Sequence, residues 1–461
     1  MKCLIKLVIA TVLFFSTNVY FSPARASEGD SAALKIFKQH KINPEHLSIE
    51  IRKDDKIIEN INAKMLKNPA SVSKLMTTFA VLKRLPLGFR FKTQLYYEDG
   101  QLYLKGAGDP SFVSEKMWFL VNEFIRTQNA SIKDIVVDDS LFDSVRFDES
   151  RESTRVDRAY DAPIGAMSFN WNAVNIFVRP GSVGGKAAVH IDPLSDYYQL
   201  INLTTTVSGK AKKDLVVSIS NANKKITVSG DISKDSLEKA IFKSIDDPAL
   251  WSGQQLKAFL KQRGILVSGN VRVGTTPPSA ALVANSESKS LAEILADMNK
   301  FSNNFVAEML TKTLAAQDTK QRASLAKGVE AIRDELKSAG LTPQDFTFVN
   351  PSGLTQENRL SAYAVNKILS AMKDDFRTYS LVLESLPISG LDGTLKKRMK
   401  NTIAEGWVRG KTGYLDTVAA LSGYAGRKNG DVFTYTFLYN GPRDEAIVRE
   451  AFDQVLINLL K

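Results

Sequence analysis

Histidine and cysteine are nearly absent from this chain of 461 residues. Its three histidines are His40, His46 and His190, and its one cysteine is Cys3. So few histidines argue against a metal centre built on a histidine cluster. A Ser-His-Asp triad would need one of the three beside the nucleophile, and no Gly-x-Ser-x-Gly nucleophile elbow occurs. The glycine-rich segment 105–112 is too short for a dinucleotide fingerprint. We therefore expect an activity that needs neither a metal nor an organic cofactor.

Long hydrophobic runs are also missing after the N-terminal segment. Lys2 and Lys6 precede the apolar run Leu7–Phe15, and residues 24–26, Ala-Arg-Ala, form a small-x-small cleavage signal. We therefore expect residues 1–26 to be a signal peptide that is cleaved after Ala26. An uncleaved anchor is less favoured, because polar residues follow the run before it reaches the ~20 apolar residues of a membrane span. The predicted mature protein is exported, with at most peripheral membrane association.

The predicted mature chain contains no cysteine, because Cys3 lies within the signal segment. Export without disulfides is typical of a bacterial periplasm rather than of a eukaryotic secretory route. Loss of three cations (Lys2, Lys6 and Arg25) with that segment would lower the formal charge from +11 to +8. A positive surplus can favour anionic polymers such as cell-wall material. The chain shows no aromatic-basic signature of nucleic-acid binding, so we expect no nucleic-acid partner.

The length of the chain predicts two or three domains rather than a single core. Residues 174–273 have the pattern of short strands, interrupted by one helix around residues 249–263. Residues 290–372 are mostly helical in pattern, and strands return between 407 and 438 before a last amphipathic helix. A β-rich stretch is thus bracketed by helical segments, which predicts a discontinuous catalytic domain that carries a large insertion.

Ser71 and Lys74 are the first candidates for catalysis. Pro69 can begin a helix, and the apolar residues after Ser71 predict a largely buried one. On that helix the hydroxyl and the amine lie one turn apart on the same face. A neutral amine can take the proton of a serine and so make a nucleophile without histidine. The same spacing, however, recurs at Ser236/Lys239, Ser286/Lys289, Ser324/Lys327 and Ser370/Lys373.

The acidic pair Asp138-Asp139 follows an expected strand. Two neighbouring carboxylates can serve as a general acid and a general base. A turn with exposed carboxylates is the commoner arrangement, and we favour that interpretation here.

Two later motifs distinguish Ser71 from the other matches. Ser-Asn-Asn at 302–304 stands where a helix is expected to begin, a position at which such side chains also act as simple caps. Lys-Thr-Gly at 411–413 stands at an expected strand, where its glycine would let a substrate backbone approach closely. Each motif alone is weak. The ordered set Ser-x-x-Lys, Ser-x-Asn, Lys-Thr-Gly is the signature of serine penicillin-recognising enzymes.

The long gap between the first two motifs exceeds that of ordinary β-lactamases. With this long gap and the three ordered motifs, the chain resembles the D-alanyl-D-alanine carboxypeptidase/endopeptidase family of class C low-molecular-mass penicillin-binding proteins. Further segments are similar to that family and extend the resemblance over nearly the whole mature chain: Pro69-Ala70-Ser71, Gly108-Asp109-Pro110, Asp138-Asp139-Ser140, Ser352-Gly353-Leu354-Thr355 with Asn358-Arg359, and Leu391-Asp392-Gly393-Thr394-Leu395.

The resemblance implies an α/β (α+β) fold with a serine β-lactamase/transpeptidase-like domain. That domain would have a five-stranded antiparallel sheet covered by helices. It would be assembled from about residues 27–88 and 285–461, and residues 89–284 would form one or two inserted β-rich domains. This location of the insertion agrees with the strand pattern of the sequence.

The resemblance also implies roles for the motif residues. Ser71 would attack the carbonyl of the penultimate D-Ala of a peptidoglycan stem peptide, and Lys74 would be its base. We expect burial and the charge of Lys411 to hold the pKa of Lys74 below the usual value of about 10.4. Ser302 would relay the proton to the leaving amine, and Asn304 would hold the substrate amide.

The third motif would bind the end of the substrate. Lys411 and Thr412, followed by Gly413, would hold the terminal carboxylate. The backbone N–H groups of Ser71 and Tyr414 would form the oxyanion hole. Penicillins and other β-lactams would acylate the same serine and inhibit the enzyme.

Two residues depart from the family pattern. Tyr414 stands where a small hydroxyl residue is usual, and Gln356 stands where arginine often helps to recognise the third stem-peptide residue. The sequence therefore does not fix the preferred third residue of the stem peptide. It also leaves open the balance of carboxypeptidase and endopeptidase cleavage, the rate of β-lactam deacylation and whether the protein forms a homodimer. A β-lactamase or an esterase on the same fold, and a non-catalytic penicillin-binding cell-wall protein, are the alternatives.

Overall fold

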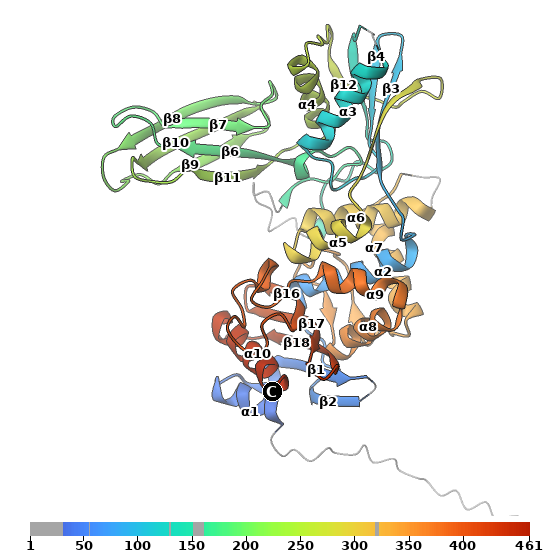
Figure 1. The fold of residues 1–461 in the computed structure, drawn as a ribbon, viewed down its shortest axis with the longest axis vertical. Helices are drawn as coiled ribbons and strands as arrows, with labels where there is room; N and C mark the ends of the chain where they lie inside the picture. The colour runs from blue at the N-terminus through green and yellow to red at the C-terminus, as the bar shows by residue number, and fades with distance from the viewer. Residues whose placement is uncertain (1–30, 55, 129–130, 151–160, 319–321) are drawn as a thin grey trace, which may run out of the picture.

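The computed structural model describes residues 31–54, 56–128, 131–150, 161–318 and 322–461. The predicted signal peptide, residues 1–26, lies outside these ranges. Figure 1 shows the first and last elements of the chain together at one end of the molecule. The strands of the middle of the chain occupy the other end, and part of them project sideways as an arm.

The sheet at the first end has five antiparallel strands in the order β16-β17-β18-β1-β2. Its members are β1 (Leu47–Lys53), β2 (Lys56–Ile61), β16 (Val408–Leu415), β17 (Val418–Gly426) and β18 (Val432–Asn440). Alternate side chains of its strands lie in two apolar clusters, one on each face. One face packs against α1 (Ala32–Gln39) and α10 (Glu445–Leu459). This arrangement confirms the predicted antiparallel sheet covered by helices.

A helical layer covers the other face of this sheet. It comprises α2 (Lys74–Arg84), α5 (Leu291–Lys300), α6 (Asn304–Asp318), α7 (Leu325–Ser338), α8 (Ala362–Asp374) and α9 (Phe376–Ser385). Helix α5 begins in a capping box, in which Ser290 and Glu293 each bind the other's backbone N–H. A short ladder of β14 (Phe346–Thr347) and β15 (Arg359–Leu360) holds the two ends of the loop 348–358. That loop reaches the active site described below.

The middle of the chain first forms a second five-stranded sheet, β12-β5-β4-β3-β13, with two helices. Its elements are β3 (Lys92–Glu98), β4 (Gln101–Lys105), α3 (Ser114–Thr127), β5 (Asp134–Asp138), α4 (Pro248–Gln262), β12 (Val271–Val273) and β13 (Ala281–Glu287). Strand β13 was not among the expected strands, although its first half, residues 281–284, is apolar. It pairs with β3 up to Glu287. The sheet therefore extends past residue 284, the end of the insertion that the family resemblance implies.

Two three-stranded sheets form the arm, with the strand orders β11-β6-β7 and β8-β10-β9. Their strands are β6 (Ala173–Arg179), β7 (Ala188–Asp192), β8 (Gln199–Val207), β9 (Val216–Ser220), β10 (Lys225–Ser233) and β11 (Lys239–Ser244). Their buried side chains share one apolar cluster with the second five-stranded sheet. The β-rich character expected for this stretch is confirmed.

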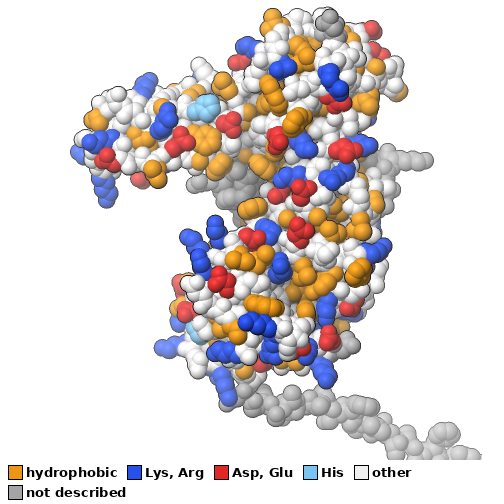
Figure 2. Space-filling view, in the orientation of Figure 1, with side chains coloured by type: hydrophobic (Ala, Val, Ile, Leu, Met, Phe, Trp, Pro, Cys, Tyr) orange, Lys and Arg blue, Asp and Glu red, His pale blue; other side chains and the backbone are white. Residues whose placement is uncertain are grey.

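The surface of the molecule mixes both signs of charge. Figure 2 shows Lys and Arg side chains over both ends of the visible face, with acidic side chains among them. The positive surplus is therefore not gathered into one stripe on this face. No helix in the described ranges is long and apolar enough to cross a bilayer.

Candidate active site

Ser71 lies in a 3-10 turn, Ala70–Ser73, and not in the α-helix predicted to begin there. The helix α2 starts only at Lys74. The preceding Ala70 has a φ of 45°, a left-handed backbone that costs an L-residue roughly 1 kcal/mol. Asn68 stabilises this conformation, because its Oδ1 accepts the Ala70 N–H at 2.9 Å. The nucleophile is thus presented by a turn whose backbone conformation is held by side-chain hydrogen bonding.

Two glycines let neighbouring segments contact this turn. A Cβ on Gly353 would lie 2.0 Å from the carbonyl oxygen of Ala70, and one on Gly413 would lie 2.6 Å from that of Pro69. Both distances are far below van der Waals contact. Gly413 is therefore needed for β16 to lie against the nucleophile turn, a reason that the sequence pattern did not indicate.

Replacement of Gly353 by alanine should displace the nucleophile turn. Its φ of 77° alone costs alanine about 1–2 kcal/mol, and the new methyl group would overlap the Ala70 carbonyl. We expect loss of penicillin labelling together with a lower midpoint of urea unfolding. The matched control is Gly264→Ala, since Gly264 has a φ of 79° but no atom within 4 Å of the new Cβ. Equal labelling of the two variants would contradict the proposed contact.

Lys74 is wholly buried beside the candidate nucleophile. Its Nζ lies 3.0 Å from Ser71 Oγ and 2.8 Å from Asn304 Oδ1, and it also donates to the carbonyl oxygen of Ser352. As an ammonium, Lys74 donates to all three of these oxygens. If it loses one proton while Asn304 and Ser352 keep its other two N–H groups, its lone pair faces Ser71 Oγ. The geometry is therefore suited to removal of the serine proton.

Three of the other four Ser-x-x-Lys segments make contacts unlike those of Ser71 and Lys74. Ser324 caps α7 by accepting the backbone N–H of Lys327. The amines of Lys289 and Lys373 bind Asp297 and Asp54, respectively. In the first segment, by contrast, the amine of Lys74 contacts the hydroxyl of Ser71.

The loop 348–358 supplies a partner that the three sequence motifs do not include. The carbonyl oxygen of Ser352 accepts hydrogen bonds from both Ser71 Oγ and Lys74 Nζ. Asn350 holds this residue, since its Oδ1 accepts from Ser352 N and Oγ. Asn358 in turn binds the backbone of Asn350 and donates to Ser73 Oγ at 2.9 Å. The two asparagines that flank Ser-Gly-Leu were the available sequence signal for this support.

Ser302 faces the third motif. Its φ is 55°, again left-handed, and its Oγ accepts a hydrogen bond from Lys411 Nζ at 2.9 Å. The N-terminal cap of α6 comes instead from Asn303, whose Oδ1 accepts the Val306 N–H. The hydroxyl of Ser302 is therefore directed at a catalytic-site lysine and does not cap the helix.

Lys411 lies on β16, which is an edge strand of the sheet, and its side chain is wholly buried. Its Nζ donates to Ser302 Oγ and, at 2.7 Å, to the carbonyl oxygen of Thr412. Burial lowers the pKa of Lys411 from 10.5 to about 7. The amine can therefore change its charge near neutral pH, whereas the sequence-based expectation treated Lys411 as a constant positive charge.

The remaining residues of the third motif lie at the mouth of the site. Thr412 Oγ1 donates to Thr394 Oγ1 at 2.8 Å, and this pair is exposed. The side chain of Tyr414 is 60% exposed. Gln356 is exposed on the loop 348–358, where its Oε1 accepts from Asn68 Nδ2 at 3.4 Å. Thr394 was not among the predicted site residues; the segment that contains it, Leu391–Leu395, was noted only as similar to the family.

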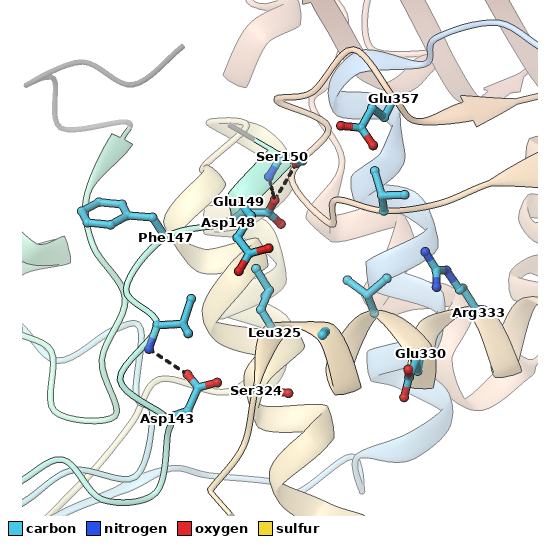
Figure 3. Close-up of a pocket in the computed structure, with 14 residues that line it drawn as sticks. Asp143, Phe147, Asp148, Glu149, Ser150, Ser324, Leu325, Glu330, Arg333 and Glu357 are labelled. Carbon is cyan, nitrogen blue, oxygen red and sulfur yellow. Dashed lines mark hydrogen bonds between the residues drawn. The ribbon is translucent and has the colours of Figure 1, made fainter. Parts of the chain in front are cut away.

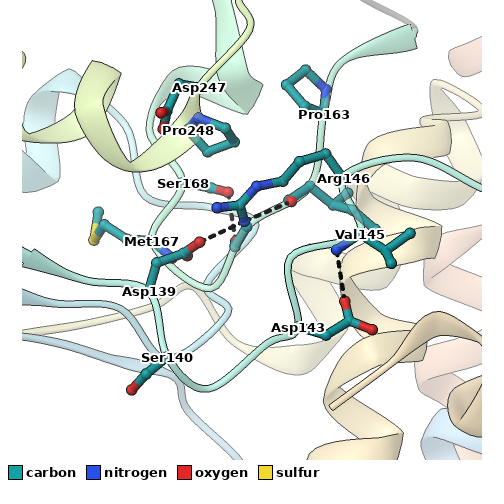
Figure 4. Close-up of polar contacts among 12 residues, drawn as sticks. Asp139, Ser140, Asp143, Val145, Arg146, Pro163, Met167, Ser168, Asp247 and Pro248 are labelled. Carbon is teal, nitrogen blue, oxygen red and sulfur yellow. Dashed lines mark hydrogen bonds and ion pairs between the residues drawn. The ribbon is translucent and has the colours of Figure 1, made fainter. Parts of the chain in front are cut away.

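The acidic pair Asp138-Asp139 is buried, so the prediction of exposed carboxylates is wrong. Asp139 forms an ion pair with Arg146 at 2.5 Å and accepts the Met167 N–H at 2.6 Å, as Figure 4 shows. Burial raises the pKa of Asp139. Asp138 accepts the backbone N–H of Thr276 at 2.8 Å. These carboxylates join separate segments of the inserted stretch.

A cavity of about 490 Å³ lies beside the active-site loop (Figure 3). None of the motif residues lines it. Its ionisable lining side chains are Asp143, Asp148, Glu149, Glu330, Glu357 and Arg333. Ser150 on its wall accepts a hydrogen bond from Asn350 Nδ2 at 3.3 Å. The cavity is thus a neighbour of the catalytic residues, and its excess of carboxylates favours cationic groups.

The histidines have other partners. His40 bonds to the carbonyl of Ile36, His46 packs edge-on against Tyr439, and His190 lies on β7 in the arm. In the part of the chain that the structure describes, no group of three or more His, Cys, Asp or Glu side chains could hold a metal ion. Lysine is therefore the basic side chain in contact with Ser71 Oγ.

Comparison with known families gives one match that spans the chain. The profile of the D-Ala-D-Ala carboxypeptidase 3 (S13) family matches residues 35–459. A D-alanyl-D-alanine carboxypeptidase of Actinomadura sp. (strain R39) is 29% identical over 398 residues, which cover 81% of this chain and 73% of that protein. The D-alanyl-D-alanine carboxypeptidase DacB of Haemophilus influenzae is 24% identical over 84% of this chain and 83% of its own.

Solved structures share the fold. Penicillin binding protein 4 (dacB) from Haemophilus influenzae superposes with a TM-score of 0.79 at 20% identity, covering 94% of this chain and 100% of that one. A second structure of that protein is complexed with a β-lactam and has a TM-score of 0.74. A predatory endopeptidase from Bdellovibrio bacteriovorus, in complex with an immunity protein, has a TM-score of 0.54 at 16% identity, covering 90% of this chain and 92% of its own.

Proposed function

Because this chain belongs to the D-Ala-D-Ala carboxypeptidase 3 (S13) family, it is a serine D-Ala-D-Ala peptidase, and we propose that Ser71 carries its acyl-enzyme. The observation that supports this assignment is the 3.0 Å contact between Lys74 Nζ and Ser71 Oγ. The substrate is the peptidoglycan stem peptide. Terminal and cross-link cleavage differ only in the amine that leaves, so one acyl-enzyme serves both.

In the first step Ser71 Oγ attacks the carbonyl carbon of the penultimate D-Ala. Its proton passes to the neutral amine of Lys74, whose two N–H groups are held by Asn304 and Ser352. The bond to the last residue then breaks, and the departing nitrogen takes up a proton relayed by Ser302. Water hydrolyses the resulting ester, which releases the shortened stem peptide and restores the Ser71 hydroxyl.

The other motif residues bind and polarise the substrate. Asn304 holds the substrate amide, and Lys411 and Thr412, with Gly413 behind them, receive the terminal carboxylate. The backbone N–H groups of Ser71 and Tyr414 stabilise the developing oxyanion, each donor being worth about 3 kcal/mol of barrier. A backbone donor does not depend on the identity of the side chain, so Tyr414 is compatible with this role.

Mass spectrometry tests the acyl-enzyme directly. Incubation with benzylpenicillin should add one penicilloyl group, and digestion should locate it on the peptide that contains Ser71. A stem-peptide substrate should release D-Ala under the same conditions. An adduct on another residue would contradict the assignment, and turnover of the adduct within seconds would indicate a β-lactamase instead.

The pKa of Lys411 predicts a pH dependence of substrate binding. Since this pKa is about 7, the amine is mostly protonated below that pH and increasingly neutral above it. A neutral amine binds a carboxylate more weakly than an ammonium does. We therefore expect KM to rise as the pH increases through about 7, measured by D-Ala release over a range on both sides of that value. A Lys411→Arg variant, which stays charged, should lack this rise; a flat KM for the wild type would contradict the role.

We propose the domain division and the location on the following grounds. Strands at both ends of the chain share one sheet, which supports a catalytic unit made of about residues 27–88 and 285–461, with residues 89–284 inserted and β13 carrying the inserted sheet on to Glu287. The composition of residues 1–26 supports a cleaved signal peptide and a bacterial periplasmic location. The Haemophilus influenzae relative is complexed with a β-lactam, which supports β-lactams as covalent inhibitors here. Size-exclusion chromatography of the mature protein would establish whether it forms a homodimer.

A further inference from the structure

Thr394 lies outside the three catalytic motifs but beside the proposed carboxylate site. Its Oγ1 accepts a hydrogen bond from Thr412 Oγ1 at 2.8 Å, and the pair is exposed at the mouth of the site. We infer that the Thr394 hydroxyl binds the C-terminal carboxylate of the substrate together with Thr412. This inference rests on the proposed function and adds a specificity-determining residue to it.

The position of Thr394 is held by buried and ionic contacts on both of its sides. It belongs to a short 3-10 turn, Gly393–Leu395, whose Leu395 side chain is wholly buried. The neighbouring Asp392 accepts the Ile388 N–H at 2.8 Å and forms an ion pair with Lys300. Because Lys300 closely precedes the second motif, this ion pair links the Thr394 turn to the segment that carries Ser302.

A carboxylate has two oxygens, and the site needs donors for both. In the free protein Lys411 directs hydrogen bonds at Ser302 Oγ and at the carbonyl oxygen of Thr412. Tyr414 shares a strand face with Thr412, but its hydroxyl is carried at the far end of an aromatic ring and its side chain is largely exposed. Thr394 offers a short hydroxyl at the required place. When a carboxylate enters, the Thr412–Thr394 bond opens and each hydroxyl donates to one oxygen.

The test compares three variants on one substrate pair. Thr394→Val keeps the shape and removes the hydroxyl, whereas Thr394→Ser keeps the hydroxyl. With a D-Ala-D-Ala peptide, Thr394→Val should raise KM about tenfold, the effect of one lost hydrogen bond to a charged group, and Thr394→Ser should stay within about threefold of wild type. With the same peptide bearing a C-terminal amide, KM of Thr394→Val should be unchanged. Thr402→Val, which removes a hydroxyl bound to Met399 O in a nearby loop, controls for general loosening.

A second-site substitution separates a binding role from a structural one. Tyr414→Thr places a short hydroxyl on the same strand face as Thr412, so it should restore KM in the Thr394→Val background. Wild-type KM in Thr394→Val, or an equal loss on the amidated peptide, would overturn the inference. An equal rise of KM in Thr402→Val would also overturn it. If the wild-type chain neither releases D-Ala nor forms a penicillin adduct, the proposed function itself fails and the inference fails with it.

Discussion

Ser71→Ala should abolish both the release of D-Ala from stem peptides and covalent labelling by penicillin. The variant lacks the oxygen that forms the ester, and the neighbouring Ser73 hydroxyl is already bound to Asn358 at 2.9 Å. Loss of a catalytic nucleophile typically lowers kcat by a factor on the order of 10⁶. Labelling with a fluorescent penicillin on a denaturing gel, together with chromatography of released D-Ala, measures both effects.

Ser370→Ala is the matched control for this substitution. Ser370 begins another Ser-x-x-Lys segment, on α8, whose lysine binds Asp54 at 2.7 Å. This variant should retain wild-type labelling and D-Ala release. Full labelling of Ser71→Ala, or an equal loss in Ser370→Ala, would contradict the assignment of the nucleophile.

Lys74→Met should give the second largest loss. Methionine fills much of the same buried volume, but it removes the amine that contacts Ser71 Oγ at 3.0 Å. Positioned general bases contribute about 10²–10⁴-fold to a rate, and we expect the rate constant of penicillin acylation to fall by about 10³. Stopped-flow or quenched-gel measurement of the acylation rate, at matched protein concentration, gives this number.

The control for the lysine is Lys373→Met. It removes an exposed ion pair with Asp54 and should change neither the acylation rate nor the melting temperature by much. A melting curve of Lys74→Met shows whether the variant is folded when its rate is measured. Acylation of folded Lys74→Met within tenfold of the wild-type rate would contradict a role for Lys74 as the base.

The catalytic residues could be predicted from the sequence because they stand in short motifs with fixed spacing. Ser71 and Lys74 are one turn apart, and that spacing alone brings hydroxyl and amine together on a helical turn. The order of the three motifs then separated this pair from four others with equal spacing. The supporting residues Asn350 and Asn358 have no such spacing relative to Ser71, and they reach it through the fold of the loop 348–358.

Local structure was predicted less well where tertiary contacts determine it. The chain at Ser71 forms a 3-10 turn, because Gly353 and Gly413 bring other segments against it. Strand β13 has only a short apolar half, residues 281–284, and its polar residues join the sheet by pairing with β3. Burial of the Asp138-Asp139 pair likewise depends on partners that the sequence pattern does not reveal. Asp138 binds Thr276, which is distant in the chain, and Asp139 binds Met167 and Arg146, which show no recognisable pairing pattern with it.

The sequence by itself determined the chemistry of this protein: a lysine-assisted serine, ordered motifs and a long insertion, in a chain with almost no histidine. Those features depend on residue type and spacing, which are local. The tertiary structure decided how the two lysines differ. Lys74 contacts Ser71, while Lys411 contacts Ser302 and is buried deeply enough to lower its pKa to about 7. It also brought Thr394 to Thr412, because proximity and desolvation arise only when distant segments pack together.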